Sequence, residues 1–172
     1  MTEHCPIETE RKYLARIPSL PQLRAMPEHT ESDIEQVYLA APEGQTHRIR
    51  RRRYADRTVC TETVKTRLNA LQAYEEEHEI TEREFEKKRL DRDPTRRIIC
   101  KKRHTFVYKK QVFEVDIYPF WEQQCVVETE LSDPSEQAEF PPLLTVLREV
   151  SADRSYSNAA LSRRIPAEDT AR

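Results

Sequence analysis

The sequence predicts a mainly β domain of the α+β class whose sheet closes into a barrel around charged side chains. Short segments alternate apolar and polar residues with a period of two, a pattern typical of strands. Charged residues make up 35% of the 172 residues, and they recur on one face of successive strands. This length suits a single domain.

Strands account for most of the predicted elements. Gly44, the only glycine in the chain, marks a hairpin turn between two of them. Glu75–Ile80 fits either a strand or the approach to a helix, and Leu147–Ser151 fits one more strand. The other strands are predicted over Pro6–Ala15, Ile34–Ala40, Thr46–Tyr54, Thr58–Thr66, Arg97–Phe106, Gln111–Tyr118 and Cys125–Leu131.

Helices are expected at fewer places. Thr81 and Glu84 match a capping box, and the helix should stop near Asp93 because the residue before a proline resists helical geometry. Asp133-Pro-Ser-Glu136 predicts a second helix, with proline at its first position. Short helical turns are also predicted over Leu20–Met26 and Tyr156–Leu161.

No repeat or linker divides the chain, so residues 1–172 are predicted to form one domain, with a core at about 5–161 and a flexible tail at 162–172. The 29 basic residues nearly cancel the 31 acidic ones, which disfavours a general nucleic-acid binder. No apolar run reaches the roughly 20 residues that span a bilayer, and the start lacks an apolar signal segment. We therefore expect a cytoplasmic protein with no membrane partner.

Cysteine and glycine usage excludes further classes of site. The four cysteines lie far apart with no C-x-x-C pair, which argues against a zinc site and a disulfide scaffold. One glycine cannot build a P-loop or a dinucleotide fingerprint, each of which needs several. Any phosphate must therefore be held by side chains.

Like charges gather on the same face of individual strands. Arg48, Arg50 and Arg52 occupy alternate positions, so in a strand they project from one side. A solvated outer face is the alternative, but such faces usually mix the two signs with Ser, Thr, Gln and Asn. The acids on this face are Glu8, Glu10, Glu79, Glu114, Asp116, Glu128 and Glu130. The bases are Lys12, Arg48, Arg50, Arg52, Lys65, Lys101 and Arg103.

A barrel with this face inward would set a basic wall against an acidic wall. Burying unpaired ions costs several kcal/mol each, so the interior must be a water-filled tunnel. Its natural ligand is a polyanion that carries a divalent metal. Carboxylate oxygens without a histidine or cysteine cluster suit Mg²⁺ or Mn²⁺. Most of the scattered histidines are expected to be ordinary surface residues; they are His4, His29, His47, His78 and His104.

The order of short charged motifs resembles the CYTH superfamily, also called triphosphate tunnel metalloenzymes. Glu8-Thr9-Glu10-Arg11-Lys12 is similar to the family's E-x-E-x-K start. The later motifs follow in the family's order over roughly residues 5–161: Ile34–Leu39, Arg48-Ile-Arg50, Thr63-Val-Lys65, Glu77-His-Glu79-Ile80, Lys101-Lys-Arg103, Glu114-Val-Asp116, Glu128-Thr-Glu130 and Asp153–Asn158.

The resemblance implies an eight-stranded antiparallel tunnel that acts on triphosphates with Mg²⁺ or Mn²⁺. The residues implied to grip phosphate are Lys12, Arg48, Arg50, Lys65, Lys101, Arg103 and, in the closing segment, Arg154. The implied metal ligands are Glu8, Glu10 and Glu128 beside the attacking water, and Glu79 and Glu130 beside the phosphate oxygens. Asp116, Glu114 and Glu77 are implied as supporting or alternative ligands. Tyr38 with Lys12 is implied as a pair that activates water.

The chain departs from the family pattern at three positions. The family often has glycine where Val37 stands and where Phe120 or a neighbour stands, and it often has arginine where Glu75 stands. Glu75 removes a phosphate contact, so the substrate range is the property most affected. Arg51 and Arg53 face away from Arg48 and Arg50 and are expected to be solvated.

The resemblance implies hydrolysis of inorganic triphosphate to pyrophosphate and phosphate. A class IV-type adenylyl cyclase and a thiamine or nucleoside triphosphatase keep the fold and change the chemistry. A non-catalytic polyphosphate-binding protein is a third alternative. The expected partner is a small-molecule triphosphate, and the sequence leaves monomer and homodimer open.

Overall fold

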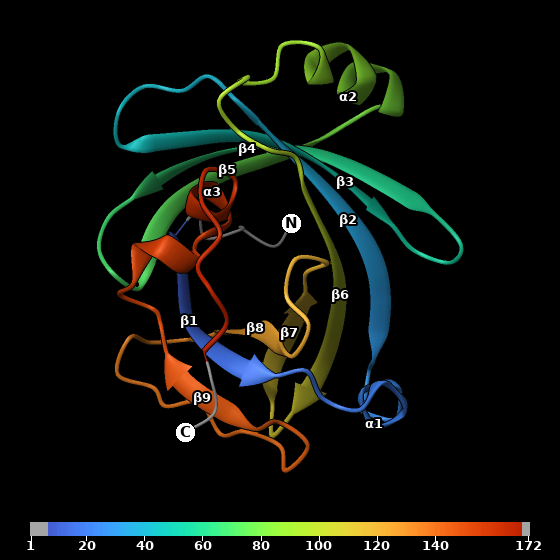
Figure 1. Ribbon diagram of the computed structural model, residues 1–172, viewed down its shortest axis with the longest axis vertical. Coiled ribbons are helices and arrows are strands. Elements are labelled where there is room, and N and C mark those ends of the chain that lie inside the picture. The colour runs from blue at the N-terminus through green and yellow to red at the C-terminus, as the bar shows by residue number, and fades with distance from the viewer. Residues whose placement is uncertain (1–6, 170–172) are drawn as a thin grey trace.

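The computed structural model describes residues 7–169, which form a closed barrel of eight antiparallel strands (Figure 1). The fold class predicted from the sequence is therefore confirmed. The barrel strands are β1 (Ile7–Arg16), β2 (Thr30–Leu39), β3 (Gln45–Arg53), β4 (Thr58–Arg67), β5 (Gln72–Ile80), β6 (Ile99–Tyr108), β7 (Gln111–Ile117) and β8 (Gln124–Glu130).

Strand β1 closes the barrel because it pairs with two different strands. Residues Ile7–Thr9 pair with β5, and residues Glu10–Arg16 pair with β8. The order around the barrel is β5-β4-β3-β2-β6-β7-β8-β1. A short strand, β9 (Val146–Glu149), pairs antiparallel with residues Tyr13–Ala15 of β1. Strand β2 pairs with β6 rather than with a sequence neighbour on that side, which brings two distant segments together.

The helices are short and lie around the barrel. They are α1 (Leu20–Arg24), α2 (Glu82–Arg89), the 3-10 turn η1 (Arg154–Tyr156) and α3 (Asn158–Leu161). The capping box of α2 forms as predicted: the amide of Glu84 donates to Thr81 Oγ1 at 3.1 Å, and the amide of Thr81 donates to Glu84 Oε2 at 2.7 Å. None of the helices within residues 7–169 is long and apolar enough to cross a membrane.

The helix predicted at Asp133 is wrong, and a turn stands in its place. The Asp133 carboxylate accepts hydrogen bonds from both the amide and the hydroxyl of Ser135, at 2.8 and 2.5 Å. This local bonding satisfies the backbone without a helix. The ambiguous segment Glu75–Ile80 is strand, and β2 starts at Thr30, four residues before the predicted start.

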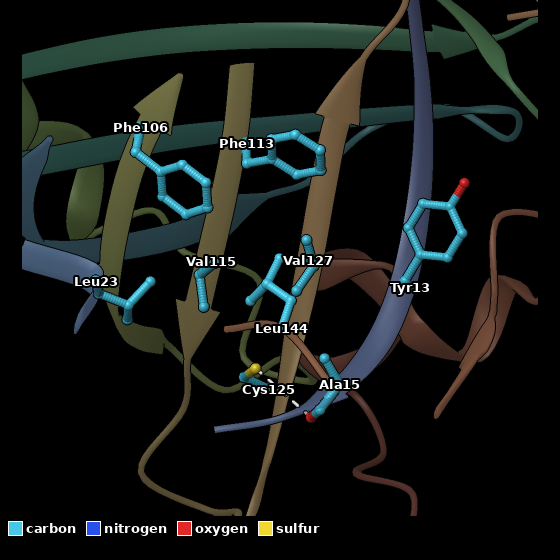
Figure 2. Close-up of a cluster of buried hydrophobic side chains, with 9 residues drawn as sticks. All are labelled: Tyr13, Ala15, Leu23, Phe106, Phe113, Val115, Cys125, Val127 and Leu144. Atoms are coloured by element: carbon cyan, nitrogen blue, oxygen red, sulfur yellow. Dashed lines mark hydrogen bonds between the residues drawn. The ribbon is translucent and has the colours of Figure 1, made fainter. Parts of the chain in front are cut away.

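An apolar cluster covers the outside of the β1, β6, β7 and β8 wall (Figure 2). Phe106 and Phe113 stack with ring centroids 5.6 Å apart, and Leu23 of α1 and Leu144 pack onto the same cluster. The members of this outer core alternate along their strands with the charged residues of the opposite face. The apolar faces are therefore turned outward, under covering segments, which leaves the inner faces to the charges.

Helix α2 covers a second part of the outer wall. Phe85 is fully buried among Val37, Ile49 and Cys60. The Arg51 guanidinium lies 4.6 Å from the centre of the Phe85 ring. Arg51 also forms ion pairs with Glu35 of β2 at 2.7 Å and with Glu86 of α2 at 2.5 Å.

The expectation of solvation is thus wrong for Arg51 and correct for Arg53, which is exposed. Arg51 joins α2 to the barrel because its planar group can stack on a ring and bond two carboxylates at once.

A third apolar cluster occupies the inside of the barrel toward one end. Leu14, Val126 and Tyr118 lie two residues along their strands from the charged residues Lys12, Glu128 and Asp116. Trp121, Val150, Tyr156 and Leu161 from the loops and the closing segment complete this cluster. The interior is therefore not a water-filled tunnel over its whole length: apolar side chains pack one end, and charges line the rest.

The end of the chain, predicted to be a flexible tail, contacts the barrel as far as residue 169. Trp121 Nε1 donates to the carbonyl of Pro166 at 3.0 Å, and the Glu168 carboxylate accepts from the amide of Gln123 at 2.7 Å. Arg148 pairs with Asp169 at 2.7 Å. These contacts hold residues 166–169 beside the β7–β8 connection. Residues 1–6, which include His4 and Cys5, and residues 170–172 lie outside the described part.

We predict that Phe85→Ala lowers the free energy of unfolding by about 3–5 kcal/mol, because a fully buried aromatic side chain leaves a cavity between α2 and the barrel. The measurement is urea unfolding followed by circular dichroism. Leu90→Ala is the control, since Leu90 is 84% exposed and its loss should change stability by less than about 0.5 kcal/mol. Equal effects of the two substitutions would contradict this packing.

Candidate functional site

A cavity of about 580 Å³ lies inside the barrel. Ten Lys and Arg side chains and six Glu side chains line it, so its wall is rich in both signs with an excess of positive charge. Such a wall favours an anion and offers carboxylate oxygens to a cation. The closing segment also contributes to the lining, through Arg154 of η1 and through Ser157.

Most of the residues selected from the sequence meet at this cavity. They come from all eight barrel strands and from the closing segment. The selected residues in the lining are Glu8, Glu10, Lys12, Tyr38, Arg48, Arg50, Lys65, Glu77, Arg103, Glu114, Glu128 and Arg154.

Four selected residues lie elsewhere. Lys101 and Asp116 are fully buried below the cavity, where Lys101 Nζ lies 2.5 Å from Asp116 Oδ2. Asp116 also accepts two hydrogen bonds from Arg103, at 2.6 and 2.7 Å. Glu79 and Glu130 are exposed near strand ends and do not line the cavity.

Asp116 therefore positions Arg103 instead of presenting a free oxygen to a metal. The Arg103 and Lys101 charges outweigh burial and lower the pKa of Asp116, so it is ionised at neutral pH. Arg103 reaches into the cavity, where it pairs with Glu114 and, at 3.4 Å, with Glu128. Burial and the neighbouring Arg103 lower the pKa of Lys101 to about 8.

Several lining residues had no role in the sequence-based site. Arg52 continues the row of Arg48 and Arg50. The sequence pattern places it on the charged face but assigns it no role in the site. Arg67 follows Lys65 at the same two-residue interval, so the strand period could have identified it. Arg96 and Arg163 come from segments outside the strands, where no periodic signal exists.

The acidic part of the cavity is built by β1 with β8. Burial, and then the charge of Glu128, raises the pKa of Glu10. Burial also raises the pKa of Glu8 to about 7, with Glu75 adding to the effect and Lys65 opposing it. The positive charge around these two carboxylates is therefore too small to offset the cost of ionising them in a buried site.

The basic part is built by β3. Arg50 has no carboxylate partner within ion-pair distance among residues 7–169, and burial together with Arg48 lowers the pKa of its guanidinium to about 10. The Nε atoms of Arg48 and Arg50 are both buried without a hydrogen-bond partner in the described structure. Unpaired donors on buried cations favour an anionic ligand, because an unmet buried donor is costly.

Glu75 lies inside the cavity between two cations. It pairs with Arg48 at 3.3 Å and with Lys65 at 3.0 Å. These charges outweigh burial and lower the pKa of Glu75 to about 2. The departure from the family pattern therefore does more than remove a cation: it places a competing anion on two of the groups selected for phosphate binding.

Lys12 and Tyr38 do not form the expected pair. Lys12 Nζ contacts Glu128 Oε1 at 2.9 Å, and the Tyr38 hydroxyl accepts from Gln36 Nε2 at 2.6 Å. Burial lowers the pKa of Lys12, but Glu128 and Glu10 outweigh it and raise the pKa overall. Burial raises the pKa of Tyr38. Both groups stay protonated at neutral pH, so neither is a base in this arrangement.

The donor set of the cavity fits a hard divalent cation. Glu8, Glu10 and Glu128 supply oxygens only, the ligands that Mg²⁺ and Mn²⁺ prefer. A cation among them would favour the ionised forms of Glu8 and Glu10, whose pKa values burial raises. Glu114 lines the same side of the cavity and offers a further oxygen pair.

Comparison with protein-family models finds no match, and no curated protein matches the chain. Several solved structures do match it. The crystal structure of the inorganic triphosphatase NE1496 is 26% identical, covers 93% of this chain and 97% of its own, and superposes with a TM-score of 0.59.

Two other solved structures share the fold at lower identity. The PH1819 protein of Pyrococcus horikoshii is 22% identical, with a TM-score of 0.56, and covers 73% of this chain and 79% of its own. A putative adenylate cyclase of Vibrio parahaemolyticus is 14% identical, with a TM-score of 0.50, and covers 73% of this chain and 78% of its own. The closed barrel and its charged lining agree with the resemblance of the motifs to the CYTH superfamily, and the chain shares its fold with these solved structures.

Proposed function

We propose that this protein hydrolyses inorganic triphosphate to pyrophosphate and phosphate with the help of Mg²⁺ or Mn²⁺. The observation that carries the proposal is the cavity in which unpaired cations and crowded carboxylates share one wall. A chain of phosphates that carries a divalent cation satisfies both groups at once. The 26% identity to a triphosphatase over nearly the whole chain supports the same reaction class.

The cations would hold the phosphate chain by its non-bridging oxygens. Arg50 has free donors, and Arg103 is fixed in the cavity by its bonds to Asp116. Displacement of Glu75 by the phosphates would free Arg48, whereas Lys65 would keep a second partner in Glu8, which lies 2.9 Å from its Nζ atom. Guanidinium groups suit this task, because their fork of donors matches two phosphate oxygens. Arg154 of the closing segment also lines the cavity and adds a further cation to this set.

The carboxylates Glu8, Glu10 and Glu128 would hold the metal, which when bound lowers the pKa of coordinated water and offsets the charge on phosphate oxygens. The chain's own part is alignment and charge neutralisation, which phosphoryl transfer needs more than covalent chemistry. Water attacks the terminal phosphorus in line, the bridging P–O bond breaks, and pyrophosphate leaves. Lys12 contacts Glu128 at 2.9 Å and so fixes the direction of that carboxylate.

The lining favours an inorganic substrate over a nucleotide. Recognition of a base usually uses an aromatic or apolar surface with a few polar groups. Among the residues that line the cavity, Tyr38 is the one aromatic side chain, and its hydroxyl is already bonded to Gln36. The rest of the lining is dominated by charged groups, which suit a ligand that is charged along its length.

The direct test is phosphate release from tripolyphosphate. We expect turnover with Mg²⁺ or Mn²⁺ and none with a chelator, and slower or no phosphate release from ATP and thiamine triphosphate. Glu128→Gln should lower kcat at least about 100-fold, because it removes a charged oxygen donor and frees Lys12. Cyclic AMP formed from ATP faster than tripolyphosphate is cleaved would contradict the proposal, as would binding of tripolyphosphate without turnover.

Tyr38→Phe should retain activity. The hydroxyl is protonated and bonded to Gln36, so it is not the base for the attacking water, and we expect kcat to change by less than about tenfold near neutral pH. Steady-state kinetics with tripolyphosphate measure this. A fall in kcat of several hundred-fold, with the fold retained, would contradict this prediction and show that the Tyr38 hydroxyl takes part in activating the water.

Glu8→Gln should change the pH dependence of stability. The folded protein raises the pKa of Glu8 to about 7 from 4.5, so it binds more protons than the unfolded chain between these values, and the free energy of unfolding falls as pH rises through this window. The variant removes that loss. We expect it to match the metal-free wild type near pH 4 and to exceed it by about 1 kcal/mol at pH 8, since solvent screens a side chain that is 40% exposed.

Urea unfolding at several pH values, with a chelator present, measures the difference between the two proteins. Because titrating groups away from this position act equally in both, the difference reports Glu8 together with its neighbours Lys65 and Glu75. Mg²⁺ should restore the wild type at pH 8 and help Glu8→Gln less. A difference that does not vary with pH would contradict the burial of Glu8 as a crowded carboxylate.

A further inference from the structure

Two histidines and a glutamate meet on the outer face of the barrel, on the opposite side of the strands from the cavity. Glu31 of β2 lies opposite His104 of β6 in the strand register, and His29 precedes β2 by one residue. On β6, His104 faces outward, because its neighbours Lys101 and Arg103 belong to the inner charged face. The pairing of β2 with β6 brings these residues together although 73 positions separate Glu31 from His104 in the chain.

The three side chains present their donor atoms toward one another. His29 Nε2 lies 3.0 Å from His104 Nδ1, and His104 Nδ1 lies 4.0 Å from Glu31 Oε2. One donor atom from each residue falls within a group whose members are all within 4.8 Å of one another. His104 is fully buried, and its other ring nitrogen, Nε2, has no hydrogen-bond partner in the described structure.

We propose that His29, Glu31 and His104 form a second metal site, which binds a transition metal of the Zn²⁺ class. Two imidazole nitrogens and one carboxylate oxygen are a donor set that Zn²⁺ takes in proteins, with water at the fourth position. The same set is unsuited to Mg²⁺, which prefers oxygen ligands. The two sites of this protein would therefore select different ions by ligand chemistry.

The hydrogen bond between the two rings lies where a metal would bind. In a neutral imidazole one nitrogen carries hydrogen and the other offers a lone pair. Without metal, one ring donates its proton to the other across 3.0 Å. For a metal to bind both nitrogens, the donating ring would move its proton to its other nitrogen, so that both rings stay neutral and each turns a lone pair to the shared position.

The carboxylate is held from its other side. Arg24 of α1 bonds Glu31 with two nitrogens, at 2.9 and 3.3 Å, and Lys102 lies 3.2 Å from Glu31 Oε1. These cations compete with a metal for the carboxylate charge. They can move away, because the Arg24 side chain is 53% exposed and that of Lys102 is 39% exposed. A hydrogen bond from Arg24 to the oxygen that does not bind the metal would then orient the carboxylate.

A second cluster of similar composition supplies a matched control. His47 and His78 both contact Glu62, but His47 lies 2.7 Å from Oε1 and His78 lies 3.3 Å from Oε2. Lys88 also contacts Oε1, at 3.1 Å. Here a carboxylate separates the two rings and their nitrogens do not converge, so the cluster is a set of ion pairs with no shared position for a metal.

The test is calorimetric titration of the full chain with Zn²⁺ in saturating Mg²⁺, so that the carboxylates of the cavity are already filled. We expect one Zn²⁺ per chain in the wild type and in His78→Asn. In His29→Asn and Glu31→Gln the affinity should fall at least about tenfold, since even the loss of an outer hydrogen-bond partner weakens metal sites by about 10–100-fold. His29 and Glu31 are only partly buried, so these variants should fold.

Co²⁺ in place of Zn²⁺ reports the ligands directly. An intense visible absorption band from a four-coordinate, imidazole-bound Co²⁺ is expected in the wild type and in His78→Asn, and its loss in His29→Asn. The proposal is overturned if no Zn²⁺ binds beyond the Mg²⁺-filled cavity, if His29→Asn binds as tightly as the wild type, or if His78→Asn loses the metal equally. Tripolyphosphate turnover in Mg²⁺ should be unchanged in His29→Asn, which separates this test from that of the proposed function.

Discussion

Charges of both signs that have too few partners inside the barrel are the constraint on which the other features of this protein depend. Arg50 carries a buried guanidinium without a carboxylate partner among the described residues, and burial raises the pKa of Glu8 and Glu10. Folding alone does not satisfy these groups, because unpaired ions in a protein interior are costly. A ligand that brings both negative and positive charge relieves both. These groups therefore suit the metal-bound polyphosphate that we propose as the ligand.

The stability needed to keep such an interior comes from the outside of the barrel. The cluster around Phe106 and Phe113 and the contact of α2 through Phe85 bury the apolar faces of the same strands that present charges inward. One end of the interior is also apolar, around Leu14 and Tyr118. Most of the hydrophobic core therefore lies between the outer face of the barrel and the segments that cover it. This arrangement allows a thin-cored, highly charged chain to fold, since strand alternation separates the two environments at every second residue.

The alternation of residues with a period of two predicted the strands and their charged inner face, including the residues of β1, β3 and β8 that meet at the cavity. The resemblance in the motifs implied the eight-stranded tunnel. The alternation could not predict depth along the barrel. Asp116 and Tyr118 share a face, yet Asp116 bonds Arg103 and Tyr118 packs in an apolar cluster. The two side chains differ in depth along the barrel axis, which the stagger of the strands sets. The same lack of non-local information hid the meeting of His29 with His104 and the stacking of Arg51 on Phe85. At Asp133, local side-chain bonding replaced the helix that the motif predicted.

The central claim, that cation and polyanion satisfy one cavity together, is tested most directly by their mutual effect on binding. Imidotriphosphate, in which nitrogen replaces the bridging oxygens and resists hydrolysis, can be titrated into the protein with and without Mg²⁺. If the two ligands share the cavity, Mg²⁺ tightens the binding of imidotriphosphate, and imidotriphosphate tightens the binding of Mg²⁺ by the same factor, which we expect to be at least about tenfold. Equal affinities with and without Mg²⁺, or weaker binding in its presence, would show that the cavity holds the anion by its basic side chains alone and would contradict the account.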